Sequence, residues 1–228
     1  MSVRVSRRLT LNRIGTGISS VNVHELAPGF WYWMAPHPEW EPTENWPEEV
    51  LCVYYESSDG IVLIDPLLPR GEEAEFWRAL DADVDRLRQP VRVLLTAPWH
   101  VRDTSTVVDR YAASVWAPPR ARWEGPALTT TDDLPTGVEA LLPDGDENQA
   151  LFLVRDHQAL VTGDIFSCTG GRFHVFVDEQ DPEPFLAWLP RLSELPLKRV
   201  LIAHGEPVLS DGATHVREAV AEARALHP

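Results

Sequence analysis

The sequence has only two cysteines, and this scarcity excludes several kinds of protein. Cys52 and Cys168 are too few for a disulfide framework, and their separation matches no structural zinc motif. Cys52 lies in the apolar run from Val50 to Tyr55. We therefore expect Cys52 to be a small, buried hydrophobic residue.

Long apolar stretches are missing as well. No run approaches the roughly 18 apolar residues that a membrane-spanning helix needs. The N-terminal arginines are not followed by the apolar core of a secretory signal. We therefore expect a cytoplasmic protein without a membrane partner.

Basic residues are outnumbered by acidic ones. Lysine and arginine together number 20 against 35 aspartates and glutamates, and the formal net charge is -15 at pH 7. Nucleic-acid backbones and anionic membranes both require positive potential on their partners. The charge balance therefore predicts no nucleic-acid partner and favours a small molecule as substrate or ligand.

No internal repeat or low-complexity linker divides the 228 residues, of which 44% are hydrophobic. That share is enough for a sizeable core. We expect a single domain over residues 1–228, in which residues 1–48 form an N-terminal arm and an aromatic, proline-rich segment. The first 20 residues are expected to be an irregular arm or an edge strand.

Apolar patterns predict strands and helices throughout the chain. Strands are expected at residues 29–34, 49–56, 61–65, 91–96, 114–117, 138–142, 150–154, 159–162 and 199–203. Helices are expected at residues 71–80, 104–111, 183–192 and 214–226. This mixture suits two sheets packed face to face with helices outside, which is a four-layer αββα sandwich of the α+β class.

Four segments point to a functional site. A hairpin ends at Asp65, a buried strand leads into the loop around His100, and two later apolar strands end at Asp164 and His204. In order and spacing these segments resemble the metallo-β-lactamase-fold hydrolase superfamily over roughly residues 45–228. The resemblance implies an αββα fold, and it implies that Asp65 anchors the neighbouring loops.

The resemblance also implies a metal centre. Members of the superfamily carry an H-x-H-x-D-H motif, a middle histidine, a carboxylate that bridges two metals and a last histidine. Asp164 stands at the position of the bridging carboxylate and His204 at that of the last histidine. Imidazole and carboxylate ligands suit zinc or iron, which would generate a nucleophilic hydroxide.

The first motif is degenerate in this chain. The alignment we prefer places Pro98, His100, Arg102 and Asp103 on its four positions. Proline cannot bind a metal, and arginine brings a permanent cation where a carboxylate is expected. A shifted alignment leaves no ligand, and the middle histidine is missing. The candidate metal ligands are therefore His100, Asp103, Asp164 and His204.

Two interpretations of this degenerate site stay open. Asp103, Asp164 and His204 could hold one divalent metal ion, zinc, iron or manganese, with His100 nearby. Alternatively, Arg102 occupies the vacated space and pairs with Asp164 or Asp103, since a guanidinium matches a carboxylate with two hydrogen bonds. We prefer the metal-free interpretation, because it explains an arginine beside retained acids.

Aromatic residues suggest a substrate pocket. Trp99 adjoins His100, while Trp40 and Trp46 lie in a proline-rich segment that cannot form regular structure. His174 follows the Gly-Asp motif where the resemblance places loop residues near the substrate. The structural alternative is that the tryptophans complete the core and that His174 is an ordinary strand residue.

These residues predict one of two functions. In the first, the protein hydrolyses a small ester, thioester, lactone or amide. His100, Asp164 and His204 organise the centre, and Arg102 stabilises the oxyanion. In the second, the protein is non-catalytic and binds a small molecule or a protein through the former active-site cleft. The two differ in whether the acids bind a divalent ion or pair with Arg102.

Overall fold

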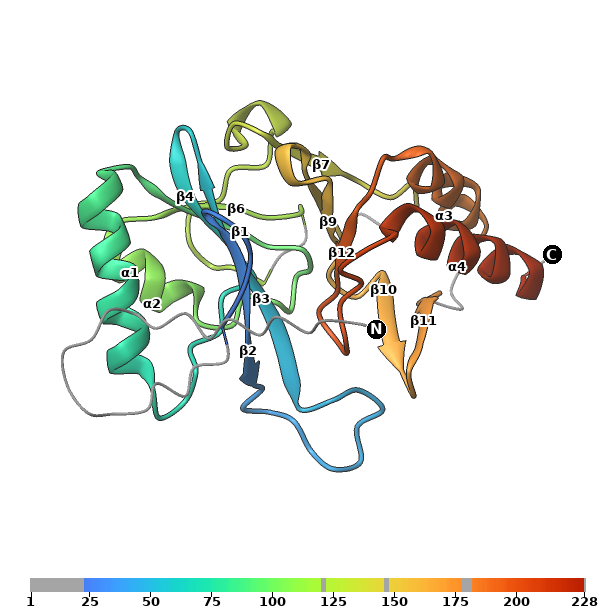
Figure 1. The fold of residues 1–228 in the computed structure, drawn as a ribbon, viewed down its shortest axis with the longest axis horizontal. Helices are drawn as coiled ribbons and strands as arrows, with labels where there is room; N and C mark the ends of the chain where they lie inside the picture. The colour runs from blue at the N-terminus through green and yellow to red at the C-terminus, as the bar shows by residue number, and fades with distance from the viewer. Residues whose placement is uncertain (1–22, 120–121, 146–147, 178–181, 228) are drawn as a thin grey trace, which may run out of the picture.

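A computed structural model describes residues 23–119, 122–145, 148–177 and 182–227, so the expectation for residues 1–20 lies outside the described residues. A six-stranded sheet occupies one half of the molecule (Figure 1). Its strands pair antiparallel from β1 to β4, and β5 and β6 then continue parallel to β4. The strands in spatial order are β1 (Val23–Ala27), β2 (Phe30–Pro36), β3 (Glu49–Ser57), β4 (Gly60–Ile64), β5 (Val91–Leu94) and β6 (Ser114–Trp116).

A second sheet of four strands packs against the first. Its outer strand β12 runs parallel to β9, and the other pairs are antiparallel. The strands in spatial order are β12 (Arg199–Leu201), β9 (Ala159–Val161), β8 (Leu151–Val154) and β7 (Val138–Leu141). A separate hairpin consists of β10 (Phe166–Thr169) and β11 (Arg172–Val175).

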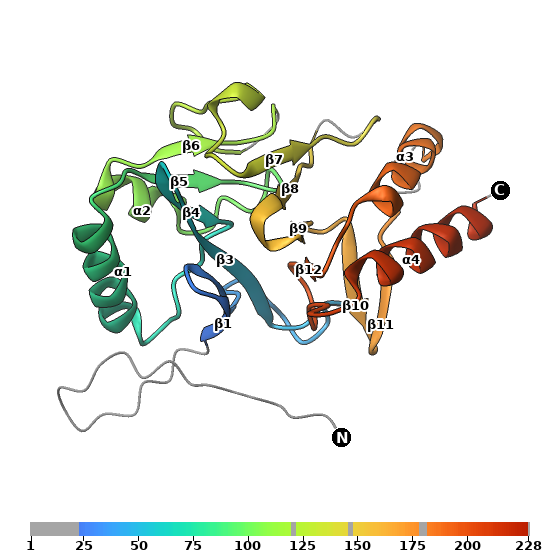
Figure 2. The same cartoon turned by 45° about the horizontal axis from the view of Figure 1, so that its top comes forward.

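Helices cover the outer face of each sheet. The helices α1 (Glu73–Leu87) and α2 (Thr104–Tyr111) lie outside the first sheet, and α3 (Glu183–Trp188) and α4 (Gly212–Leu226) lie outside the second (Figures 1 and 2). Three apolar clusters separate these layers, and the middle one joins residues of both sheets. Each sheet thus buries both faces, and the predicted αββα sandwich is confirmed.

The strand and helix predictions hold with a few corrections. Helix α1 runs to Leu87 rather than residue 80, and α3 ends at Trp188, where a 3₁₀ helix (Leu189–Glu194) takes over. The strands β1 and β10 were not predicted, and β11 was expected only through the alternative that His174 is a strand residue. Short 3₁₀ helices also lie at Thr131–Asp133 and Arg155–His157. Among the described residues, no helix has the length and apolarity to cross a membrane.

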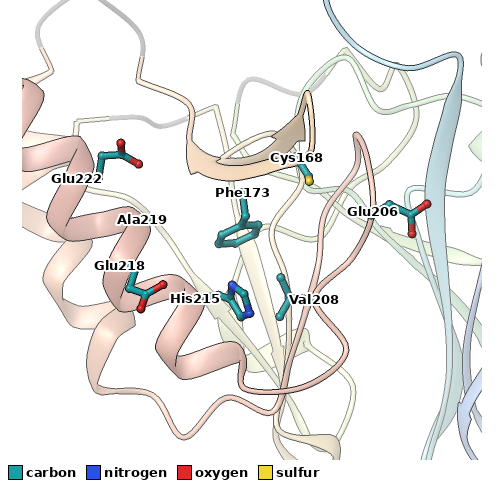
Figure 3. Close-up of a pocket in the computed structure, with 9 residues that line it drawn as sticks. Cys168, Phe173, Glu206, Val208, His215, Glu218, Ala219 and Glu222 are labelled. Carbon is teal, nitrogen blue, oxygen red and sulfur yellow. The ribbon is translucent and has the colours of Figure 1, made fainter. Parts of the chain in front are cut away.

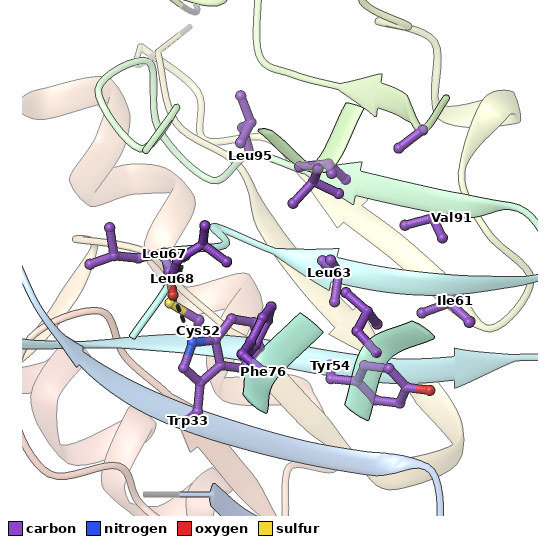
Figure 4. Close-up of a cluster of buried hydrophobic side chains, with 14 of the residues drawn as sticks. Trp33, Cys52, Tyr54, Ile61, Leu63, Leu67, Leu68, Phe76, Val91 and Leu95 are labelled. Carbon is purple, nitrogen blue, oxygen red and sulfur yellow. Dashed lines mark hydrogen bonds between the residues drawn. The ribbon is translucent and has the colours of Figure 1, made fainter. Parts of the chain in front are cut away.

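The cluster beneath α1 contains Cys52, as the sequence predicted (Figure 4). Its thiol is fully buried and accepts a hydrogen bond from the backbone N–H of Leu67 at 3.3 Å. Leu67 also accepts a bond from the Trp33 indole at 2.8 Å. Burial raises the pKa of Cys52 to about 11, so the thiol stays protonated at neutral pH.

Four strands end close together where the two sheets meet. Backbone hydrogen bonds link Leu51 to Ala203 and Ala150 to Thr96, and an isolated bridge pairs Val50 with His204. Because β4 and β5 are parallel, as are β9 and β12, their carboxyl ends face this junction. Loops that follow parallel strands at such an edge commonly carry functional side chains.

The turn after β9 brings the second sheet against the first at Gly163. Its φ angle of +55° is unfavourable for residues with a side chain, and a Cβ there would lie 2.5 Å from Thr96 Oγ1. The sequence Gly163-Asp164 is therefore dictated by sterics as well as by chemistry. Only glycine lets the backbone approach Thr96 this closely.

We expect Gly163→Ala to lower the free energy of unfolding by about 1–3 kcal/mol more than Gly171→Ala does. Gly171 is the matched control, since its φ of +78° carries the same backbone penalty but no atom lies within 4 Å of an added Cβ. Urea unfolding of both variants measures the difference. Equal losses would show that the contact with Thr96 imposes no constraint.

Candidate metal centre

The Asp65 carboxylate, directly after β4, organises the loop that follows β5. Its Oδ1 accepts the backbone N–H of Thr96 at 2.8 Å, and its Oδ2 accepts the Thr96 hydroxyl. The same Oδ2 lies 3.0 Å from His100 Nδ1. Both Asp65 and His100 are buried. The anchoring role that the resemblance gave to Asp65 agrees with these contacts, and the direct contact with His100 was not predicted.

His100 and His204 converge on the carboxylate of Asp164. His100 Nε2 lies 3.3 Å from Asp164 Oδ1, and His204 Nε2 lies 3.2 Å from the same oxygen. All three ligand atoms lie within 4.8 Å of one another, and these residues could together hold a metal ion. The structure thus brings together three of the four predicted ligands, from loops of both sheets.

These contacts are compatible with a set of metal ligands. Asp164 Oδ1, the oxygen that both histidines approach, is buried and has no hydrogen bond of acceptable geometry. Ligand atoms 2.0–2.1 Å from one tetrahedral zinc ion would be separated by roughly 3.3–3.4 Å, close to the two distances observed. Two imidazoles and one carboxylate are also a donor set of catalytic zinc and non-haem iron sites.

The three side chains stabilise one another's charged forms. Burial alone would lower the pKa of His100, but the carboxylates of Asp164 and Asp65 outweigh it and raise the pKa to about 9. Burial alone would raise the pKa of Asp164, whereas His100 and His204 hold it well below its usual range. Without a metal, the imidazolium of His100 therefore neutralises Asp164.

Two tryptophans predicted for the pocket lie beside this group. The Trp99 indole donates a hydrogen bond to Asp164 Oδ2 at 2.6 Å, and its side chain is 45% exposed. The Trp46 ring centroid lies 4.7 Å from that of His204 and 5.5 Å from that of His37. Trp40 donates its indole N–H to the carbonyl of Trp46, which ties the proline-rich segment together.

Arg102 takes a different position from the one expected. Its Nη1 donates to the carbonyls of Asp65, at 2.8 Å, and Leu51, at 3.2 Å, and lies 3.5 Å from the Cys52 thiol. Its Nε and Nη2 are buried without partners. Within the described chain, Arg102 forms no ion pair with Asp164 or Asp103. The left-handed φ of +44° turns this residue toward β3 and the end of β4.

Asp103 and His174 are engaged outside the three-residue group. The Asp103 carboxylate accepts the backbone N–H of Leu68 at 2.7 Å and lies 3.6 Å from Arg70. His174 lies on β11, where its Nδ1 contacts the carbonyl of Arg172. The structure therefore assigns the carboxylate of Asp103 to the loop after β4, and it shows no contact between His174 and the described metal-binding group.

A cavity of about 400 Å³ is lined by residues of β10, β11, α4 and the loop after His204 (Figure 3). Phe173 and His215 line it in edge-to-face contact, with ring centroids 6.1 Å apart, and Glu206, Glu218 and Glu222 supply acidic groups. None of the candidate site residues lines this cavity. The predicted pocket tryptophans belong to the junction of the sheets instead.

In chelator-treated protein, we expect the His100 imidazole to titrate near pH 9 rather than near 6.5. Asp164→Asn should lower this pKa by more than one unit, because burial and Arg102 both disfavour the charged ring. The pKa of His100 is measured by following the NMR signals of the histidine rings as a function of pH. Asp85→Asn, an exposed change on α1, is the control and should leave the titration unaltered. A His100 midpoint near 6.5 in the wild type would contradict the described contacts.

No protein-family model and no curated protein matches the sequence. Several solved structures do match it. A metallo-β-lactamase family protein from Thermus thermophilus is 17% identical with a TM-score of 0.59, and the match covers 89% of this chain and 80% of that one. A fragment of a putative diflavin flavoprotein from Nostoc sp. PCC 7120 is 16% identical with a TM-score of 0.64, covering 90% and 97%.

A metallo-β-lactamase from Erythrobacter litoralis is similar to the same extent. It is 13% identical with a TM-score of 0.62, and the match covers 89% of this chain and 92% of that one. These identities are low, but each match extends over most of both chains. The chain therefore has the metallo-β-lactamase fold, as its motifs predicted.

Proposed function

We propose that this protein is a single-metal hydrolase that cleaves a small ester, thioester, lactone or amide. The observation that carries the proposal is the convergence of His100, Asp164 and His204 at the junction of the two sheets. Three protein ligands leave coordination positions open, which is typical of catalytic rather than structural metal sites.

The residues behind the ligands support this proposal. Asp65 and Thr96 hold His100 through its Nδ1, so that Nε2 is the nitrogen directed at Asp164. Carboxylate partners of this kind fix the ring orientation and the tautomer of metal-binding histidines.

The metal-free interpretation has lost its main argument. It depended on Arg102 taking the place of a cation beside Asp164 or Asp103, whereas Arg102 binds backbone carbonyls. Its remaining donors are inaccessible to solvent, so the oxyanion role suggested for Arg102 has no support in this conformation. In place of Arg102, the two histidines and a bound cation would balance the negative charge of Asp164.

A divalent ion at this centre would supply a Lewis acid that activates water and polarises the carbonyl of the substrate. The chain's own residues orient that chemistry: His100 and His204 fix one side, and Asp164 supplies the negative charge. The indoles of Trp99 and Trp46 lie beside the group and suit an apolar acyl or leaving group.

We expect protein purified without chelator or metal-affinity resin to contain one metal ion per chain after incubation with zinc, manganese or iron. His204→Ala removes one of three ligands and should abolish binding at micromolar metal, whereas exposed His215→Ala should keep it. Elemental analysis after gel filtration measures the content.

Hydrolysis of a panel of esters, thioesters, lactones and amides then tests the activity in the metal-loaded protein. Loss of turnover in His204→Ala, with turnover retained in His215→Ala, is the expected pattern. A wild-type chain that binds no metal under any of these conditions would rule out the single-metal mechanism.

A further inference from the structure

Trp99 has an unusual combination of exposure and bonding. Its side chain is 45% exposed, yet its indole N–H donates a short hydrogen bond of 2.6 Å to Asp164 Oδ2. Hydrogen bonds to charged acceptors are stronger than those between neutral groups. The large apolar ring is thus held across the metal-binding group, rather than packed into the core.

The bond divides the two oxygens of Asp164 between different partners. Oδ1 faces both His100 and His204, while Oδ2 faces Trp99. The terminal torsion of an aspartate is broad, so a carboxylate without such a partner could turn. An indole N–H is a donor only, so it can orient the carboxylate but cannot bind a metal.

The loop that carries Trp99 is itself tied in place. The backbone N–H of His100 donates to Ala97, closing the turn around Trp99, and that of Arg122 donates to Pro98. On the other side, the His100 ring is held by Asp65. Trp99 and His100 are therefore neighbours on one turn that hydrogen bonds hold in place, and both side chains contact the carboxylate of Asp164.

We propose that Trp99 is a positioning residue of the metal centre, which holds the Asp164 carboxylate so that Oδ1 alone is presented to the ion. The inference rests on the proposed single-metal site. A residue in the loop after β5 thus acts on the centre through a ligand of the opposite sheet. Removing the N–H should weaken metal binding without unfolding the chain, since the ring is half exposed.

The contact itself is tested in metal-free protein by the NMR signal of the Trp99 indole N–H. We expect a downfield, slowly exchanging proton despite the exposure of the ring, and an upfield shift with fast exchange in Asp164→Ala. The Trp77 indole, on α1, is the internal control and should not change. A Trp99 signal that is indifferent to Asp164→Ala would overturn the proposed hydrogen bond.

The consequence is tested by cobalt affinity, measured in competition with a chromophoric chelator. Trp99→Phe keeps the aromatic ring but loses the donor, and we expect its Kd to rise about 10-fold or more, as for outer partners of metal ligands. Trp77→Phe should keep the wild-type Kd. Both variants should keep the far-ultraviolet circular dichroism of the wild type, which reports on backbone structure.

The outcomes separate this inference from the proposed function. A wild-type protein that binds cobalt, together with Trp99→Phe that binds it equally well, would overturn the role of Trp99 and leave the metal site standing. A wild-type protein that binds no cobalt would overturn the metal site and this inference with it.

Discussion

The buried Asp65 carboxylate is the interaction on which the arrangement of the centre depends. A buried charge costs several kcal/mol unless donors surround it, and here those donors are the Thr96 amide, the Thr96 hydroxyl and His100. The same Thr96 side chain is the surface against which Gly163 packs. The ends of β5 and β9 are therefore both fixed relative to the Asp65 carboxylate. This fixes the positions of His100, which follows β5, and Asp164, which follows β9.

Most of the fold could be predicted from the sequence, because its strands are buried on both faces. Runs such as Gly60–Ile64 and Leu151–Val154 are almost entirely apolar. The turns that separate successive strands contain residues typical of turns. The hairpin of β10 and β11 escaped prediction because each strand has only four residues, which grade from buried at one end to exposed at the other. Likewise, the second half of α1 was missed because acidic and basic residues dilute its apolar face.

The site was only partly predictable. Strand ends followed by Asp164 and His204 predicted two of the three candidate ligands that lie together, and the loop after a buried strand predicted His100 as the third, since a polar residue that follows a buried strand is a local signal. The position of the Arg102 side chain could not be predicted. A left-handed φ turns this side chain away from the acids, and the presence of an arginine does not reveal such a backbone conformation. Nor could spacing show that Asp103 binds Leu68, or that Trp99 reaches Asp164, 65 residues away.

The three candidate ligands come from different halves of the sandwich: His100 follows a strand of the first sheet, and Asp164 and His204 follow strands of the second. An ion held by all three is consequently a crosslink between the halves. Whatever free energy the ion gains on binding becomes resistance to separating the sheets. Metal supply would then govern the lifetime of the folded chain as well as its chemistry, and the amide protons along the Val50–His204 bridge would exchange with solvent most slowly when the ion is present.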